Sequence, residues 1–263
     1  MLAGPQLYAD HLTKERYHPR SNKHGIRLAQ LVLNDLLATC QPMREAAARG
    51  KIVYASNYDV FFSDPSVTAG VPQEVIEDLA WNIDLVIGPV GNTQSQLFPL
   101  KPGVIEKGNP KTIWMALDAK GVMTEHGKAR RNRQRDATAL SAVMHLFHPS
   151  VVVGATIPIN IARKFKSPTK KKSKGITDHG PNIGKVVSDT LAVFRAVRAV
   201  ADRIRPDGIE ALGCFVVDYQ NVRGSKASVV VAPPAPQPGD IIHYDRFVDD
   251  LATSLIQRFG SQM

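Results

Sequence analysis

The chain has 263 residues, of which 43% are hydrophobic and 22% are charged, the balance of an ordinary globular protein. Its longest apolar stretches are much shorter than the roughly 20 residues that span a bilayer. The N-terminus also lacks the basic start and apolar run of a secretory signal, so the sequence predicts a cytoplasmic protein without membrane association.

The formal net charge of +9 is concentrated in two short segments. Residues 128–135 contain five basic and no acidic side chains, and residues 163–174 contain seven basic and no acidic ones. Without these twelve residues the chain would carry −3. Local positive charge attracts a polyanion, and each neutralised phosphate releases counterions. Segment 163–174 alone could be a solvated surface, but the two segments together favour a nucleic-acid partner.

The first third of the chain is expected to contain a polar arm followed by helices and a strand, because the apolar positions repeat with periods of 3.6 or 2. These segments are an arm or loop at 1–20, helices from Asn22 to Cys40 and from Met43 to Arg49, a strand at 51–62 and a helix starting at Pro72.

The middle third is expected to alternate buried strands with other elements. These are strands at 82–91, 111–121 and 149–160, a Gly- and Pro-rich loop at 92–110 and a long helix at about 126–147. Strands that alternate with helices predict an α/β fold with a mixed central sheet flanked by helices.

The last third is expected to begin with a basic, mobile loop. Its elements are this loop at 163–184, a helix capped by Ser188 and ended by Pro206, strands at 211–220 and 227–234, and a helix at about 245–259. The two cysteines, Cys40 and Cys214, lie in apolar segments, which favours buried thiols over a disulfide or a metal site.

Two successive apolar strands carry aspartates. Asp84 lies early in the strand at 82–91, and Asp118 ends the strand at 111–121, two residues before Lys120. Residues i and i+2 of a strand share a face, so Asp118 and Lys120 are expected to point the same way. If the strands are neighbours, Asp84 and Asp118 lie close together, and two such carboxylates need a cation between them.

Oxygen ligands of this kind suit Mg²⁺, with Mn²⁺ as a substitute, and the Ala119 carbonyl is expected to be a further ligand beside Asp84 and Asp118. Such a metal lowers the pKa of water and offsets the negative charge that develops during phosphodiester hydrolysis. Lys120 is expected to orient the attacking water and to stabilise charge on the phosphate. Asp84, Asp118 and Lys120 are therefore the expected catalytic residues. The structural alternatives are a strand-entry acid at Asp84 and a surface ion pair between Asp118 and Lys120.

The order Asp84, a loop, and Asp118-Ala119-Lys120 at the tip of an apolar strand resembles the PD-(D/E)xK signature of the restriction-endonuclease-like nucleases. The resemblance implies an αβββαβ core over about 22–160, with residues of about 185–263 as a C-terminal elaboration of a single nuclease domain, 1–263. Ile83 stands where the signature has proline. An acidic residue on the helix before the sheet is frequent in the family; the candidates are Asp35, Glu45, Glu74 and Glu77.

The resemblance further implies an endonuclease that acts on double-stranded DNA, as a site-specific type II enzyme of a restriction-modification system and as a homodimer. The basic side chains expected to bind DNA lie on the helix after the motif, where a phosphate would compensate positive charge near a helix N-terminus, and in the basic loop. They are Lys128, Arg130, Arg131, Arg133, Arg135, Lys170, Lys171 and Lys172.

Three alternatives remain open from the sequence. One is a repair, phage or mobile-element nuclease of the same fold without sequence preference. The second is a non-catalytic nucleic-acid-binding protein. The third is a small-molecule α/β enzyme, which would leave both basic segments without a role.

Overall fold

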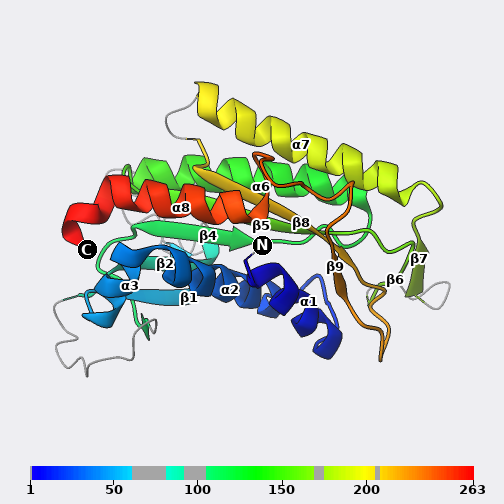
Figure 1. Ribbon diagram of the computed structural model, residues 1–263, viewed down its shortest axis with the longest axis horizontal. Coiled ribbons are helices and arrows are strands. Elements are labelled where there is room, and N and C mark those ends of the chain that lie inside the picture. The colour runs from blue at the N-terminus through cyan, green and yellow to red at the C-terminus, as the bar shows by residue number, and fades with distance from the viewer. Residues whose placement is uncertain (1, 61–80, 92–104, 169–174, 205–207) are drawn as a thin grey trace, which may run out of the picture.

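The computed structural model describes residues 2–60, 81–91, 105–168, 175–204 and 208–263 (Figure 1). Its centre is a mixed seven-stranded sheet in the order β3-β1-β2-β4-β5-β8-β9. These strands are β1 (Ile52–Val60), β2 (Trp81–Pro89), β3 (Glu106–Lys107), β4 (Met115–Ala119), β5 (Val152–Asn160), β8 (Ala211–Asp218) and β9 (Ser228–Val230). The expected α/β class with a mixed sheet is confirmed.

Strand direction changes at β4. β1, β2 and β4 pair antiparallel, whereas β4, β5 and β8 run parallel. Parallel neighbours need a crossover connection, and α6 (His126–Phe147) and α7 (Ile183–Ile204) provide the two crossovers. The edge strands are short: β3 pairs with β1, and β9 pairs with β8.

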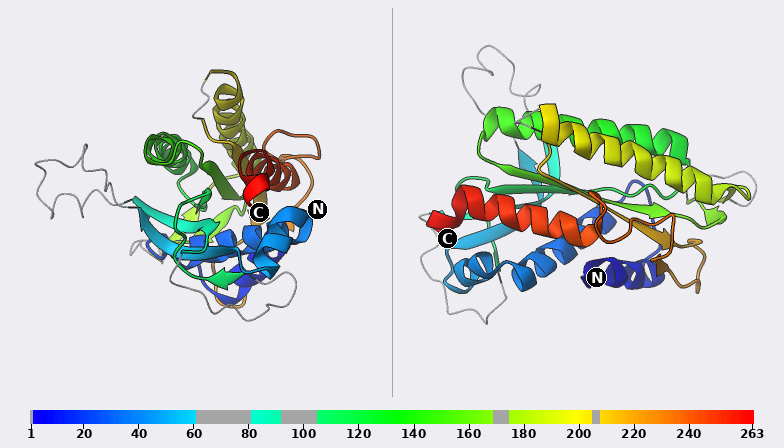
Figure 2. Two further views of the ribbon diagram at one scale, coloured as in Figure 1. Left: turned by 90° about the vertical axis from the view of Figure 1, so that its left-hand side faces the viewer. Right: turned by 45° about the horizontal axis from the view of Figure 1, so that its top comes forward.

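Helices cover both faces of the sheet, with α6 and α7 side by side on one of them (Figures 1 and 2). These two helices share one hydrophobic core with the sheet. The other core contains residues of α1 (Gly4–Lys14), α2 (Lys23–Thr39), α3 (Gln41–Ala48) and α8 (Tyr244–Phe259).

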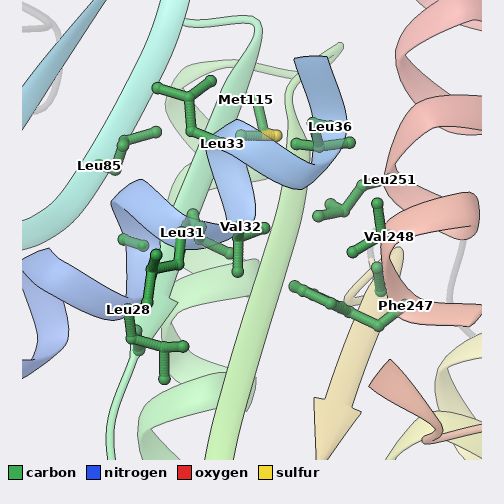
Figure 3. Packing of buried hydrophobic residues seen from close by; sticks show 14 of the residues in the cluster. Leu28, Leu31, Val32, Leu33, Leu36, Leu85, Met115, Phe247, Val248 and Leu251 are labelled. Carbon is green, nitrogen blue, oxygen red and sulfur yellow. The ribbon is translucent and has the colours of Figure 1, made fainter. Parts of the chain in front are cut away.

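The position of α2 is fixed by apolar side chains at helical spacing. Leu28, Val32 and Leu36 are fully buried and pack in one cluster with Leu85 of β2 and Leu251 of α8 (Figure 3). Burying a side chain of this size contributes about 1.5–3 kcal/mol. Because these buried side chains fix α2 on the sheet, its first turn is fixed there as well.

Two segments expected to be loops form regular structure instead. Residues 1–20 contain α1, whose Tyr8 and Leu12 are buried one helical turn apart. Few apolar residues mark this helix, so its periodicity was too weak to recognise. Segment 163–184 contains the hairpin of β6 (Lys164–Lys166) and β7 (Ile176–Asp178), because Phe165 is buried and anchors it. The prediction of a mobile loop was therefore wrong for the two strands of this hairpin.

Smaller differences concern helix ends. α7 begins at Ile183, so Ser188 is not its N-cap, and its Oγ donates to the Gly184 carbonyl inside the helix. The helix expected from Pro72 lies outside the described residues, as does loop segment 92–104. Cys40 and Cys214 are buried and free, as expected. Within the described ranges no helix has the length and apolar character needed to cross a bilayer.

A buried ionic cluster joins α6, α8 and the start of β8. Glu210 accepts a hydrogen bond from the Val153 N–H at 2.8 Å and lies 2.9 Å from His145 Nε2. Arg258 pairs with the same carboxylate. Burial alone would lower the pKa of His145, but the Glu210 carboxylate raises it above its ordinary value.

Glu210→Gln is expected to destabilise the fold by about 2–4 kcal/mol, because His145 and Arg258 lose their buried partner. A histidine whose folded pKa is raised contributes stability below its unfolded pKa and loses it as the pH rises through the folded pKa. The loss, measured by urea unfolding, should therefore be larger at pH 5.5 than at pH 9. Asp189→Asn, which breaks an exposed ion pair with Lys185, is the control and should change little. A larger loss at pH 9 would contradict this account.

Candidate active site

Asp84 and Asp118 lie opposite one another on neighbouring antiparallel strands. β2 and β4 pair Leu85 with Leu117, and continuing this register by one residue brings Asp84 opposite Asp118. Both side chains are buried, with exposed fractions of 6% and 5%. The structure therefore brings together the two acids that the sequence identified as candidates.

Backbone and lysine contacts hold the two carboxylates. The Ala119 N–H donates to Asp84 Oδ2 at 2.8 Å. Lys120 Nζ lies 2.9 Å from Asp118 Oδ1, with about a third of the lysine side chain exposed. Asp118 and Lys120 thus contact one another, as expected from their spacing.

The acids are close enough to perturb one another. Burial, and next the neighbouring Asp118 carboxylate, raise the pKa of Asp84 to about 7, although the Ala119 N–H and Lys120 act in the opposite direction. Two neighbouring buried carboxylates cannot both ionise without compensation. Lys120 offsets one of the two charges, so near neutral pH the second one needs either a proton or a further cation.

A local break in the alternation of side chains along β2 determines which face of the sheet the Asp84 side chain is on. Leu85 belongs to the core under α2, whereas Ile83, two residues earlier in the strand, belongs to the core under α6 and α7. Strict alternation would place both on the same face, so the alternation is reset at Asp84. On β1, Asn57 lies opposite this point and has a φ of 53°, in the left-handed region where asparagine is favoured.

Gly25, in the first turn of α2, lies against the same oxygens. A Cβ built on residue 25 would lie 2.7 Å from Asp84 Oδ1, 2.8 Å from Asp84 Oδ2 and 2.8 Å from the Ala119 carbonyl oxygen. Three oxygens from two strands therefore face one point beside α2. The Ala119 carbonyl, expected as a metal ligand, is next to the Asp84 carboxylate.

A cavity of about 510 Å³ opens above this group. Asp84, Ala119 and Lys120 are among its lining residues, and Asp118 borders them through its pairing with Lys120. One wall is the segment between α1 and α2 together with the start of α2, including Tyr17, Arg20, Asn22 and His24. The other wall is the first part of α6, including Lys128, Asn132 and Arg133.

The wall between α1 and α2 is held by buried polar side chains. Asn221 accepts from the Tyr17 N–H at 3.0 Å and donates to the Tyr17 carbonyl at 3.0 Å. His24 Nε2 lies 3.2 Å from the Arg16 carbonyl oxygen, and His24 Nδ1 lies 3.1 Å from His11 Nε2. No local sequence pattern indicates this wall, because Asn221 is more than 200 positions from Tyr17 and His11 lies in a helix that was not predicted.

Of the basic residues expected on α6, the structure places Lys128 and Arg133 at the cavity. Arg130, Arg131 and Arg135 do not line it. Residues 125, 128, 129, 132 and 133 form the cavity-facing side of the helix. The cavity-facing side of α6 therefore carries two of the five basic residues expected on this helix. Lys170, Lys171 and Lys172 lie outside the described residues.

No third acid joins the two aspartates within the part of the chain that the structure describes. Asp35 is buried elsewhere on α2, accepting hydrogen bonds from the Tyr244 hydroxyl and the Gly4 N–H. Glu45 pairs with Gln41 and Arg49 on α3, and Glu74 and Glu77 lie outside the described residues. The described residues contain no group of three or more His, Cys, Asp or Glu side chains arranged to hold a metal.

Comparison of the chain with protein-family models, with curated proteins and with solved structures found no match.

Proposed function

We propose that this protein is a Mg²⁺-dependent nuclease that hydrolyses phosphodiester bonds of DNA, with Asp84, Asp118 and Lys120 as catalytic residues. The observation that carries the proposal is the buried pair of aspartates, with Lys120 on one of them, beside a cavity that Lys128 and Arg133 line. Two carboxylates and a lysine beside a cationic cavity are the groups that metal-assisted phosphate chemistry uses.

The order of elements supports a restriction-endonuclease-like core. α2 is followed by the antiparallel strands β1, β2 and β4, then by α6 and the parallel strand β5. Asp84 lies on the second of these strands and Asp118-Ala119-Lys120 at the end of the third. This order agrees with the αβββαβ core that the resemblance in sequence implies, once α3 and the short strand β3 are counted as insertions; α1 precedes it, and β6, β7, α7, β8, β9 and α8 follow it.

The residues present fit a divalent cation with a preference for oxygen. The Asp84 carboxylate and the Ala119 carbonyl lie close together where they pack against Gly25, and Asp118 lies opposite Asp84 on the neighbouring strand. Asp84, Asp118 and Ala119 would hold Mg²⁺, or Mn²⁺ in its place. When bound, the ion supplies Lewis acidity toward water and the scissile phosphate.

Lys120 lines the cavity with about a third of its side chain exposed, and its ammonium group contacts the buried Asp118. In this position it hydrogen-bonds to a phosphate oxygen or to the attacking water, and it offsets charge that develops on the phosphate. The ion pair with Asp118 fixes the lysine for this task.

Site-specific cleavage of double-stranded DNA by a homodimer, as in a type II restriction enzyme, is the form of the activity that we propose from the resemblance. A nuclease of the same fold without sequence preference would use the same residues. The two differ in their products, because a long DNA substrate gives discrete bands in the first case and a smear in the second.

The test is incubation of plasmid DNA and of linear DNA with the purified chain and Mg²⁺, Mn²⁺ or EDTA. Cleavage with either ion and none with EDTA is the expected result, and end-sequencing of the products then identifies any preferred sequence. Salt-sensitive DNA binding without cleavage under any divalent ion would instead support the non-catalytic binding protein.

Lys128→Ala is expected to weaken DNA binding about 3–10-fold and to reduce the salt dependence of the affinity by about one phosphate contact. Lys128 is exposed and lines the cavity, so its ammonium is free to reach a phosphate. Arg131→Ala is the matched control, because Arg131 is exposed on the same helix but does not line the cavity. The measurement is fluorescence anisotropy over a salt series, and an equal or larger effect at Arg131 would show that DNA contacts another face of α6.

A further inference from the structure

We infer that the Tyr8 hydroxyl is a further group of this site and that it donates a hydrogen bond to a phosphate oxygen of the DNA strand in the cavity. The inference rests on the proposed function, since the phosphate is that of the substrate proposed above. Its basis is a buried hydroxyl group that has no partner within the described chain and that reaches the cavity.

Three tyrosines of the described chain are buried, and they differ in what their hydroxyl groups contact. The Tyr244 hydroxyl donates to Asp35 Oδ2 at 2.9 Å. The Tyr219 hydroxyl donates to Asn221 Oδ1, also at 2.9 Å. The Tyr8 hydroxyl, in contrast, forms no hydrogen bond within the ranges that the structure describes. A buried hydroxyl without a partner costs free energy, and buried tyrosines usually have one, so this exception requires an explanation.

The Tyr8 hydroxyl has access to the cavity above the acids. Tyr8 is one of the residues that line this cavity, although only 1% of it is exposed. Its hydroxyl oxygen is not among the described polar atoms that are fully enclosed and unpartnered. Since the hydroxyl has no partner in the described chain, its oxygen is not fully enclosed and is open to the cavity. A ligand in the cavity can therefore supply the missing acceptor.

Packing fixes the Tyr8 ring, so the hydroxyl occupies a defined position before any substrate binds. The ring meets Phe215 of β8 edge-on, with ring centroids 5.8 Å apart and an interplanar angle of 87°. One turn further along α1, Leu12 is fully buried, and the Thr13 hydroxyl accepts a hydrogen bond from the Ala227 N–H at 2.9 Å. A donor that is already in place stabilises charge on a phosphate without a cost of reorganisation.

The surroundings of Tyr8 keep its hydroxyl protonated. Burial, and next the neighbouring groups Tyr17, Asp84 and Tyr219, raise the pKa of Tyr8 well above its ordinary value. The group is therefore a hydrogen-bond donor at neutral pH and is not a phenolate nucleophile. Oxygens of a phosphodiester only accept hydrogen bonds, and tyrosine is among the side chains that bind them in protein–DNA complexes. The chemistry of the hydroxyl thus matches that of a phosphate in the cavity.

The test compares the wild type with Tyr8→Phe, which removes the hydroxyl and keeps the ring, in single-turnover cleavage of plasmid DNA with Mg²⁺. The expected result is a rate lower by about 10²-fold, with a Tm in EDTA that is not lowered. Tyr244→Phe is the matched control, because the Tyr244 hydroxyl donates to Asp35 and neither residue lines the cavity. This control should lower the Tm and leave the rate unchanged. Folded Tyr8→Phe that cleaves at the wild-type rate would overturn the inference and leave the proposed function intact.

A second measurement depends neither on cleavage nor on a variant. In wild-type chain labelled with ¹³C at the tyrosine Cζ, the nuclear magnetic resonance signal of Tyr8 should shift when a short DNA oligonucleotide is added with Ca²⁺, which oxygen ligands also bind. The signal of Tyr244 should stay in place. DNA binding that shifts the backbone signals of the cavity but not the Tyr8 signal would contradict the inference alone. A wild-type chain that neither cleaves nor binds DNA would overturn the proposed function, and the inference with it.

Discussion

Asp118→Asn is expected to lower the rate of Mg²⁺-dependent DNA cleavage by about 10³-fold or more, and Lys120→Ala by about 10²–10³-fold. Asp118 carries one of the two negative charges that would hold the cation, and asparagine keeps its shape without the charge. Lys120 supplies a positive charge beside the phosphate, and removal of one such stabilising group typically costs about 10²–10³ in rate. Single-turnover cleavage of a plasmid measures both effects without interference from product release.

The control for these variants is a second aspartate–lysine pair of similar geometry. Asp189 and Lys185 form an exposed ion pair on α7, at 3.0 Å, and Asp189→Asn and Lys185→Ala make the same chemical changes outside the cavity. These two variants should cleave at the wild-type rate. If all four variants cleave equally, the Asp118–Lys120 pair is only structural and the proposed function is wrong.

The parts of the fold with strong local patterns were predictable from the sequence. The apolar strands, the long helix at 126–147 and the C-terminal helix follow from periodicity and from bounding Gly and Pro residues. α1 was not predicted because its apolar face is short: Tyr8, Ala9 and Leu12 stand among polar residues, after Gly4 and Pro5. β6 and β7 were missed because a basic segment with one buried phenylalanine resembles a solvated loop.

The candidate site was predictable only in part, for geometric reasons. Asp118 and Lys120 are near in sequence, so their contact follows from strand geometry alone. The direction of Asp84 depends on the break in alternation opposite Asn57, which a strict alternating pattern does not anticipate. Gly25 is more than 50 residues from Asp84 in the sequence, and nothing in a helical pattern indicates what lies against a glycine.

The same buried acids that would hold a cation should make the metal-free fold less stable near neutral pH. The folded pKa of Asp84 is raised by burial and by Asp118, to about 7 from an ordinary value of 3.8. A carboxyl group with a raised pKa opposes folding once it ionises, so its cost is absent below about pH 4, grows as the pH rises and is complete above about pH 7. Bound Mg²⁺ would remove this cost, because it favours the ionised form of both acids.

Asp84→Asn is therefore expected to stabilise the metal-free chain at pH 8 by about 1–3 kcal/mol, a rise in Tm of several degrees. The asparagine side-chain oxygen still accepts the Ala119 N–H and carries no charge that must be buried. Near pH 4 the variant and the wild type should have nearly equal stability, because Asp84 is then protonated. At pH 8, Mg²⁺ should raise the Tm of the wild type but not of the variant, since the variant lacks the charge that binds the ion. Thermal unfolding of the wild type and the variant at both pH values, with Mg²⁺ and with EDTA, measures the stability difference at each pH and the effect of Mg²⁺ on each Tm. A variant that is less stable than the wild type at pH 8 in EDTA would mean that the Asp84 carboxylate is satisfied without a metal, as a structural strand residue is, and the case for a cation between these strands would be lost.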